Sequence, residues 1–301
     1  MARFLCICLS SAIQRTVNFN RLNLEDVNRA TNYRIDAAGK AVNAARVLAQ
    51  LEPGSVAAVC PIGKENREYF IQLASQDGIE LLGVEVPGKI RECWTLLDRS
   101  SCTTTEIVVD EPVLHEDYEI YEETFLLLVR EQVQKADGVL LAGSRPKCYS
   151  AGLMACIARI AVDSNKILLS DYCGEDLRRT LRVCTPQIIK INEKEFCSTF
   201  GVSEAIDGNH LKIVVEAKSR ELKNIIIVTR GNNSTYAAND GDFYEFPAEK
   251  VKPLNTTACG DSFSAGFLYE YVNYMDFESA LAKGTWCAAR NAESLRPGSI
   301  Q

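Results

Sequence analysis

Short apolar segments alternate with longer amphipathic segments along most of the 301-residue chain. The short segments are rich in Val, Ile and Leu, and most are bounded by Gly, Asn or Asp, which is typical of buried strands. Strands and helices in this order form a mostly parallel sheet with right-handed crossovers and helices on both faces. We therefore expect an α/β fold whose ligands bind beyond the carboxyl ends of the strands. The predicted strands are 3–9, 55–60, 137–142, 166–171, 187–191 and 224–229, and the predicted helices are 40–51, 64–77, 116–136, 149–164, 203–220, 260–274 and 276–294.

Two stretches interrupt this alternation. Residues 13–36 and 90–110 alternate Val, Thr, Tyr and Ile with polar residues, which is the pattern of half-exposed antiparallel strands. We expect these residues to form a small sheet that stands off the main body. Such a sheet suits a lid or a dimerisation surface, and the alternative is a plain pair of edge hairpins.

Composition and charge restrict the class of protein further. No segment rich in Pro, Gly and Ser divides the chain, so we expect one domain over residues 1–301. The net charge of −7 argues against broad contact with nucleic acid or an anionic membrane, since both require positive surface potential. A small anionic substrate remains compatible with this charge where a few cations converge.

The twelve cysteines are scattered and include no Cys-x-x-Cys pair, which argues against a zinc or redox site. Reduced thiols that act as small apolar side chains fit better, and they imply a reducing compartment. The first apolar run, residues 4–9, is shorter than the ~7–15 residues of a signal peptide. No run approaches the ~20 apolar residues of a membrane span, so we expect a cytoplasmic protein.

The sequence Ala-Cys-Gly-Asp at 258–261 stands where a predicted helix begins. A helix N-terminus presents unpaired N–H groups and a partial positive charge, and small residues let an anion approach them. Beside such an anion site, Asp261 can take the proton from a hydroxyl that attacks a phosphoryl group. The alternative is that Asp261 only caps the helix or meets its dipole, which contributes ~0.3–1 kcal/mol.

Longer segments favour the first interpretation. The segment "NTTACGDSFSAGF" at 255–267 resembles the C-terminal signature of the ribokinase-like carbohydrate kinases, the PfkB family, and "AAGKAVNAARVLAQL" at 37–51 resembles the other signature of that family. The resemblance implies a ribokinase-like three-layer α/β/α sandwich with a mostly parallel sheet and a small β-sheet lid. Further landmarks match in the same order, namely "LAGSRP" at 141–146, "SDYCGEDL" at 170–177, "IIKINEKE" at 188–195 and "IIIVTRG" at 225–231.

Within this family, "QRTVNF", "IRECWTLLD" and "TTTEIV" are most similar to the branch that contains 1-phosphofructokinase, tagatose-6-phosphate kinase and the minor 6-phosphofructokinase. Enzymes of that branch phosphorylate a sugar that already carries phosphate. The resemblance implies a kinase that uses ATP and Mg²⁺ to phosphorylate a hydroxyl of a phosphorylated ketohexose, with fructose 1-phosphate or tagatose 6-phosphate as first expectations. We also expect a homodimer joined through the lid.

The resemblance implies roles for individual residues. Asp261 is the expected base, and the backbone amides of Ala258, Cys259 and Gly260 are the expected anion hole. The positions that match substrate contacts are Gln14, Arg29, Gly39, Lys40, Asn43, Arg91 and Ser144, of which Arg29, Lys40 and Arg91 are the cations expected near the sugar phosphate. The positions that match the nucleotide site are Asn192, Glu195, Thr229, Gly231 and Asn291, and Glu195 is expected to act on magnesium through water.

Several of these residues also fit a plainer structural interpretation. Lys40 and Arg46 fit solvated helix charges, and Arg29 fits a surface ion pair. Arg91 fits an edge charge that prevents aggregation. The Asn and Glu of residues 192–195 fit a helix cap. The joint order of all these residues along the chain favours function.

The chain departs from the family pattern at four places, at one of which "GSRPKC" at 143–148 replaces the usual Gly-Ser-Leu-Pro-Pro-Gly. Gln14 stands where this branch usually has an Asp, and Ala38 and Ala258 stand where the family has Gly. Added β-carbons crowd places where backbone meets ligand. These changes leave open a kinase of an unphosphorylated sugar or nucleoside, or a non-catalytic sensor of sugar phosphate or nucleotide on the same fold.

Overall fold

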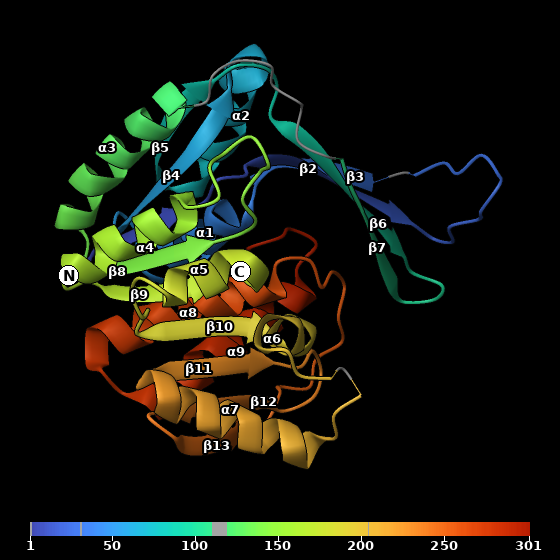
Figure 1. The fold of residues 1–301 in the computed structure, drawn as a ribbon. Helices are drawn as coiled ribbons and strands as arrows, with labels where there is room; N and C mark the ends of the chain where they lie inside the picture. The colour runs from blue at the N-terminus through green and yellow to red at the C-terminus, as the bar shows by residue number, and fades with distance from the viewer. Residues whose placement is uncertain (1, 31, 110–118, 204) are drawn as a thin grey trace.

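The computed structural model describes residues 2–30, 32–109, 119–203 and 205–301. Within these residues the larger sheet has nine strands, in the order β13-β12-β11-β10-β9-β8-β1-β4-β5 (Figure 1). Neighbours from β11 to β5 are parallel, and β12 and β13 add an antiparallel edge. The bounds are β1 Phe4–Ile7, β4 Val56–Gly63, β5 Glu80–Val86, β8 Gly138–Ala142, β9 Ile167–Asp171, β10 Ile188–Asn192, β11 Ile225–Thr229, β12 Thr235–Asn239 and β13 Asp242–Phe246.

Helices cover both faces of this sheet, which gives the three layers expected from the sequence (Figure 1). Side chains alternate across each strand, so Cys6 of β1 packs with α1, α8 and α9, whereas Leu5 and Ile7 pack with α3 and α4. The first face carries α1 Lys40–Leu51, α2 Arg67–Ala74, α8 Cys259–Tyr274 and α9 Phe277–Glu293, and the second carries α3 Glu119–Lys135, α4 Leu153–Asp163, α5 Gly174–Leu181, α6 Glu193–Phe200 and α7 Gly208–Leu222.

A second, four-stranded sheet projects from the carboxyl edge of the first, and we call it the lid sheet (Figure 1). The predicted antiparallel pairing holds in its two hairpins, β2–β3 and β6–β7, whereas the central pair β2–β6 is parallel. The reason is that β2 and β6 follow β1 and β5, which end at the same edge and therefore send the chain out in the same direction. The bounds are β2 Ala12–Phe19, β3 Asn32–Ala38, β6 Arg91–Asp98 and β7 Thr103–Val108.

All six predicted strands are present, and a helix overlaps each predicted helical segment; residues 31 and 110 of the lid stretches, and residues 116–118 and 204 of the predicted helices, lie outside the described residues. The segment 64–77 holds a shorter helix, α2, flanked by two 3₁₀ turns. The sequence interpretation missed α5, α6, β5, β12 and β13. The two helices are eight residues long and mostly polar, so they show little helical periodicity, and β12 is rich in small residues.

Candidate active site

Polar side chains gather where parallel strands of the large sheet end. Asp171 ends β9, Asn192 ends β10 and Thr229 ends β11, while Ser144 follows β8. The first turn of α8, which carries Asp261, lies at the same edge. This is the edge that the sequence interpretation assigned to ligands.

Asp261 is buried in the first turn of α8, with 8% of its surface exposed. Its Oδ2 accepts a hydrogen bond from Asn43 Nδ2 at 2.9 Å. Asp261 does not cap the helix, because the capping position is Ala258 and no side chain bonds there. Burial raises the pKa of Asp261 to about 6, although the nearby charge of Lys40 acts in the opposite direction. A carboxyl group that titrates near neutral pH suits a general base.

A compact ionic cluster lies next to Asp261, centred on the buried carboxylate of Asp171. Lys40 Nζ lies 2.9 Å from Asp171 Oδ1, and Lys190 Nζ lies 3.0 Å from Oδ2. Ser264 of α8 donates to the same Oδ2 at 2.7 Å. Burial alone would raise the pKa of Asp171, but the charges of Lys190 and Lys40 lower it. The carboxylate of Asp171 therefore lies between two lysine side chains.

Lys40 is a predicted cation whose charge acts on Asp261. Burial opposes its charge, but the negative charges of Asp171 and Asp261 outweigh burial and raise the pKa of Lys40. The interpretation of Lys40 as an ordinary solvated charge is therefore wrong. Asp171 and Lys190 were not among the predicted site residues, although each is the one charged residue of its strand, which is a usable signal.

The start of α8 has the form of an anion site. Ala258 adopts a left-handed conformation, with φ 67°, and turns the chain into the helix at Cys259. A β-carbon at Gly260 would lie 2.9 Å from Lys190 Nζ, so only glycine lets this ammonium group sit against the backbone. The N–H groups of a first helical turn lack intrahelical partners, and here they and the charge of Lys190 favour an anion, although the N–H of Cys259 already donates to Thr256 O at 3.3 Å.

Asn291 is buried and holds the loop that precedes α8. Its side chain is fully buried, and its Nδ2 donates to Thr257 O at 2.8 Å and lies 3.3 Å from Cys259 Sγ. Asn291 therefore helps to shape the loop, and its predicted role at the nucleotide site stays a prediction. Asn255 adds a second support, because its Oδ1 accepts from Thr257 N at 3.0 Å.

Two residues predicted to contact the sugar are Gly39, which precedes α1, and Ser144, which follows β8. Gly39 has φ 118°, and a β-carbon there would lie 2.8 Å from Ser10 O, so this position requires glycine. Ser144 is exposed just beyond β8, and its neighbour Gly143 donates its N–H to Asp171 O at 3.1 Å. Gly39 and Ser144 therefore border the ionic cluster.

On the lid sheet, Gln14 is buried and its Nε2 donates to Thr95 Oγ1 at 2.8 Å. Arg91 is half-buried at the start of β6. Arg29 is exposed in the segment between β2 and β3, so its approach to a ligand stays a prediction.

Asn192 and Glu195 form a reciprocal cap at the start of α6. Each side chain accepts from the other residue's backbone N–H, at 2.9 Å in both directions. The capping interpretation is therefore correct for this structure, and it leaves Glu195 near enough to Lys40 to affect its pKa. Thr229 pairs with Asn192 in the neighbouring strand, and Gly231 is exposed two residues later with φ 63°.

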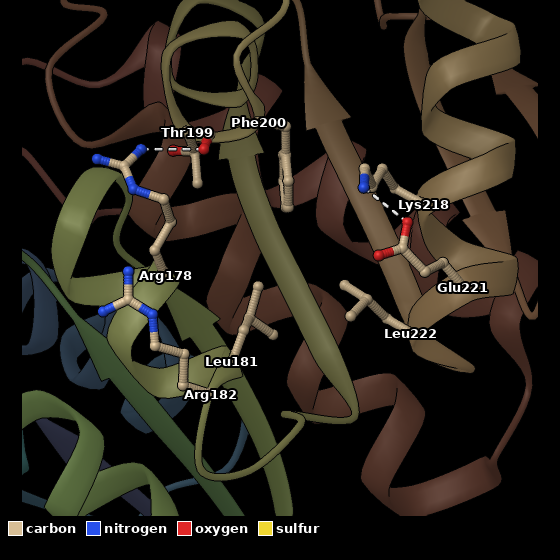
Figure 2. A pocket seen from close by; sticks show the side chains of 8 residues that line it. All are labelled: Arg178, Leu181, Arg182, Thr199, Phe200, Lys218, Glu221 and Leu222. Carbon is tan, nitrogen blue, oxygen red and sulfur yellow. Dashed lines mark hydrogen bonds and ion pairs between the residues drawn. The ribbon is translucent and has the colours of Figure 1, made fainter.

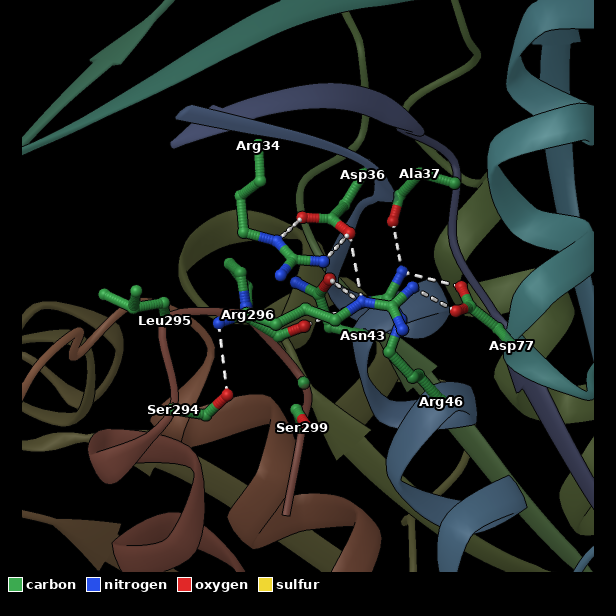
Figure 3. Close-up of polar contacts among 12 residues, drawn as sticks. Arg34, Asp36, Ala37, Asn43, Arg46, Asp77, Ser294, Leu295, Arg296 and Ser299 are labelled. Atoms are coloured by element: carbon green, nitrogen blue, oxygen red, sulfur yellow. Dashed lines mark hydrogen bonds and ion pairs between the residues drawn. The ribbon is translucent and has the colours of Figure 1, made fainter. Parts of the chain in front are cut away.

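A buried ionic network links the lid sheet to the C-terminal tail (Figure 3). Arg46 is 1% exposed and lies 2.8 Å from Asp77, so the interpretation of Arg46 as a solvated charge is wrong. Arg34 Nε lies 2.7 Å and Arg296 Nε 3.0 Å from the carboxylate of Asp36. Removing one partner from such a buried network typically costs about 3–5 kcal/mol.

A separate surface pocket of about 380 Å³ lies between α5, α6 and α7 (Figure 2). Its cations are already paired, with Arg178 Nε 3.0 Å from Glu175 and Lys218 Nζ 2.6 Å from Glu221. Residues 221 and 222 directly precede β11, so the pocket lies toward the amino ends of the strands, away from Asp261.

The model of the pfkB family carbohydrate kinases matches residues 4–299 of this chain. The chain belongs to this family. It is therefore a carbohydrate kinase, an enzyme that transfers phosphate to a hydroxyl group, as the sequence motifs implied. Relatives include a 1-phosphofructokinase of Vibrio cholerae, 27% identical over 94% of this chain and 87% of the relative, and a tagatose-6-phosphate kinase of Staphylococcus epidermidis, 24% identical over 98% and 94%.

Solved structures of this family share the fold. A possible 1-phosphofructokinase of Thermotoga maritima matches with a TM-score of 0.88 and 17% identity, over 98% of this chain and 93% of that one. Phosphofructokinase-2 of Escherichia coli in complex with fructose-6-phosphate matches with a TM-score of 0.84 and 18% identity, over 97% and 94%. The ribokinase-like fold predicted from the sequence is thus confirmed. In the described part of the chain, no helix is both long and apolar enough to cross a membrane.

Proposed function

We propose that this kinase transfers the γ-phosphoryl group of ATP to a hydroxyl of a phosphorylated ketohexose, within one domain formed by residues 1–301. The observation that carries the proposal is the buried Asp261, with its pKa raised to about 6, beside two lysines at the start of α8. The names of the relatives, 1-phosphofructokinase and tagatose-6-phosphate kinase, favour fructose 1-phosphate or tagatose 6-phosphate as the acceptor.

In this proposal Asp261 is the general base. It takes the proton of the acceptor hydroxyl as the hydroxyl oxygen bonds to the γ-phosphorus and the bond from that phosphorus to the bridging oxygen of ADP breaks. Asn43 donates to Asp261 Oδ2 and so holds the carboxylate in one orientation. The other oxygen is left to meet the hydroxyl. General-base help of this kind contributes about 10²–10⁴ in rate.

Charge that develops on the transferring phosphoryl group is stabilised by the start of α8. The amides of Ala258, Cys259 and Gly260 form the anion hole, and Lys190 adds a positive charge directly against Gly260. Because Lys40 pairs with Asp171, we infer that Lys40 also stabilises the transferring phosphoryl group rather than the phosphate already on the sugar.

The phosphate already on the sugar is held by cations of the lid sheet, with Arg91 first and Arg29 second. Gln14, Gly39, Asn43 and Ser144 contact the sugar. A neutral amide at position 14 can still bond hydroxyl groups, although it selects different ones from a carboxylate.

The nucleotide lies over the ends of β10 and β11, against Thr229 and Gly231. The residues present fit Mg²⁺, because this ion keeps several waters and needs few protein oxygens, and Glu195 and Asn192 supply oxygens at this edge. When bound, the ion neutralises charge on the nucleotide phosphates. The described residues contain no group of three or more acidic, His or Cys side chains suited to a metal, which agrees with a site held mainly by water and phosphate.

We further infer a homodimer joined through the outer face of the lid sheet. Two rows cross this face in register, Tyr33-Val17-Leu96 and Ile35-Arg15-Trp94-Ile107. Tyr33 is 71% exposed, Ile107 49% and Trp94 37%. An apolar face of this kind is uncommon on a monomer and favours a second copy of the chain as its cover.

A cytoplasmic location is part of the same proposal. No cysteine of the described residues is in a disulfide, although Cys102 and Cys156 are exposed, which suits a reducing compartment.

A screen of ADP release over sugars and sugar phosphates tests the proposed function. We expect turnover on a ketohexose phosphate and little turnover on the same sugars without phosphate. Turnover confined to an unphosphorylated sugar or nucleoside would overturn the substrate class. Silence on every acceptor, together with thermal shifts on ligand addition, would favour the sensor.

A further inference from the structure

The lid sheet is tied to the loop before the anion hole by one chain of hydrogen bonds. Gln14 Nε2 donates to Thr95 Oγ1 at 2.8 Å, Thr95 Oγ1 lies 3.3 Å from Thr257 Oγ1, and Thr257 Oγ1 donates to Glu106 Oε1 at 2.8 Å. The chain starts on β2, passes through β6 to the loop and ends on β7. It therefore joins three lid strands to the residue that precedes Ala258.

The donors and acceptors fix the direction of this chain. The carboxylate of Glu106 can only accept, so the Thr257 hydroxyl uses its single proton there. The Thr257 oxygen must then accept from the Thr95 hydroxyl, and the Thr95 oxygen accepts from the amide of Gln14. Every member has one consistent role, which is the condition for bonds in a chain to strengthen one another.

The backbone of Thr257 is also held by hydrogen bonds with Asn255 and Asn291. Its backbone N–H donates to Asn255 Oδ1 at 3.0 Å, and its carbonyl accepts from Asn291 Nδ2 at 2.8 Å. A second contact beside it, from Thr256 Oγ1 to Thr104 Oγ1 at 3.5 Å, joins the same two segments. Thr257 thus connects the lid sheet to the buried side chains of Asn255 and Asn291, two residues before the helix that carries Asp261.

This arrangement gives a physical reason for glutamine at position 14. A carboxylate there could not donate, so it would accept the Thr95 proton, and Thr257 would lose the hydrogen bond from Thr95. Gln14 and Glu106 are therefore complementary ends of the chain.

We propose that Thr257 and Glu106 are positioning residues that set the lid, and with it the bound sugar, against the anion hole. The proposal rests on the proposed function of Asp261 and the lid. These residues touch neither the reacting atoms nor the nucleotide. They act by fixing the distance between the substrate hydroxyl, held from the lid, and the phosphoryl group, held at α8.

The first test compares Thr257→Val, which removes the hydroxyl, with Thr257→Ser, which keeps it. We expect Thr257→Val to lower kcat/KM for the sugar phosphate about tenfold, because a hydrogen bond to a charged group is lost, while KM for ATP stays within about twofold. Thr257→Ser should restore most of the activity. Equal losses in both variants, or an equal rise in KM for ATP, would overturn the proposal.

A second test asks whether the chain acts as a unit. Thr95→Val and Thr257→Val should each show the loss, and the double variant should lose little more than either single variant. Losses that multiply in the double variant would show that the two hydroxyls act independently, which contradicts the proposal.

A third readout needs no turnover and so separates this proposal from the proposed function. In ligand-free protein, hydrogen exchange of the amides in 103–108 should be faster in Thr257→Val than in Thr257→Ser. Faster exchange in a protein that is inactive on sugar phosphates would support the contact between Thr257 and the lid sheet and overturn only the proposed function. Unchanged exchange together with unchanged kinetics would overturn the tie itself.

Discussion

At the scale of single residues, the account depends on the titration of Asp261. Its folded pKa of about 6 lies above the ordinary value of 3.8, mainly because of burial. The base must be ionised to act, so kcat/KM should fall about tenfold per pH unit below about pH 6. Asn43 bonds to the ionised form and lowers this pKa, so Asn43→Leu should move the acid limb to higher pH. The pH profiles of both proteins check this, and an unchanged limb in Asn43→Leu would contradict it.

The raised pKa of Asp261 also makes the stability of the fold depend on pH. A carboxyl group whose pKa is raised on folding costs stability when it is ionised, so the cost is present above about pH 6 and disappears as pH falls toward 3.8. Asp261 is therefore kept at a position where its charge does not stabilise the fold, which is typical of catalytic groups.

Ala258 is the second residue whose conformation has a measurable consequence. A non-glycine residue in the left-handed region costs roughly 1–2 kcal/mol, and Gly loses about 0.5–1 kcal/mol through its freer unfolded chain. Ala258→Gly should therefore leave the free energy of unfolding equal or slightly higher, as measured by urea denaturation. The matched control Ala282→Gly, at an exposed position within α9, should lower it by about 1 kcal/mol. A loss at position 258 as large as that of the control would show that the backbone there is not strained.

The sequence located single residues of the candidate site better than it located the residues that support them. Asp261, Lys40 and Asn43 were identified from motifs, and the structure brings them together. Arg46 was misinterpreted because a helical arginine with apolar neighbours gives no sign of a buried partner, and Asp77 is distant in sequence. The bond from Thr257 to Glu106 spans 151 residues and depends on how the lid lies over the loop, which no local pattern encodes.

At the scale of elements, the lid sheet and the large sheet divide the work. Alternation in the sequence predicted the lid strands, but the parallel pairing of β2 with β6 follows from the exit points of β1 and β5. The inner rows of the lid carry Gln14 and Thr95, and the outer rows carry Trp94 and Ile107. One sheet therefore presents a polar face to the site and an apolar face away from it.

This division predicts a selective effect of Arg91. Arg91→Ala should raise KM for the sugar phosphate strongly, by roughly 2–3 kcal/mol of lost charge-assisted bonding, and leave KM for ATP nearly unchanged. The control Lys89→Ala removes a positive charge two residues away, from an exposed side chain 3.7 Å from Glu65, and should be nearly silent. Steady-state kinetics for both substrates measure this, and equal effects on the two KM values would remove Arg91 from the sugar phosphate.

At the scale of the whole molecule, the exposed apolar face of the lid predicts association of two chains. Trp94→Asp adds a charge to the middle of that face and should give a monomer, whereas the natural protein should sediment as a dimer at micromolar concentration. The control Ile213→Asp changes an apolar residue on α7 that is more exposed than Trp94, and this variant should remain a dimer. Sedimentation velocity measures all three masses. A natural protein that is monomeric and fully active would contradict the proposed interface.

The most direct test of the account is the turnover number of Asp261→Asn. Asn keeps the size of the side chain and can still accept from Asn43, but it cannot take a proton, so kcat should fall at least about a hundredfold with ATP affinity unchanged. The melting temperature at pH 7 should stay the same or rise, because the cost of burying the charge is removed. The control Asp276→Asn changes a true capping carboxylate, at the start of α9, and should leave both kcat and stability nearly unchanged. Survival of kcat in Asp261→Asn would contradict the assignment of the base and the mechanism built on it.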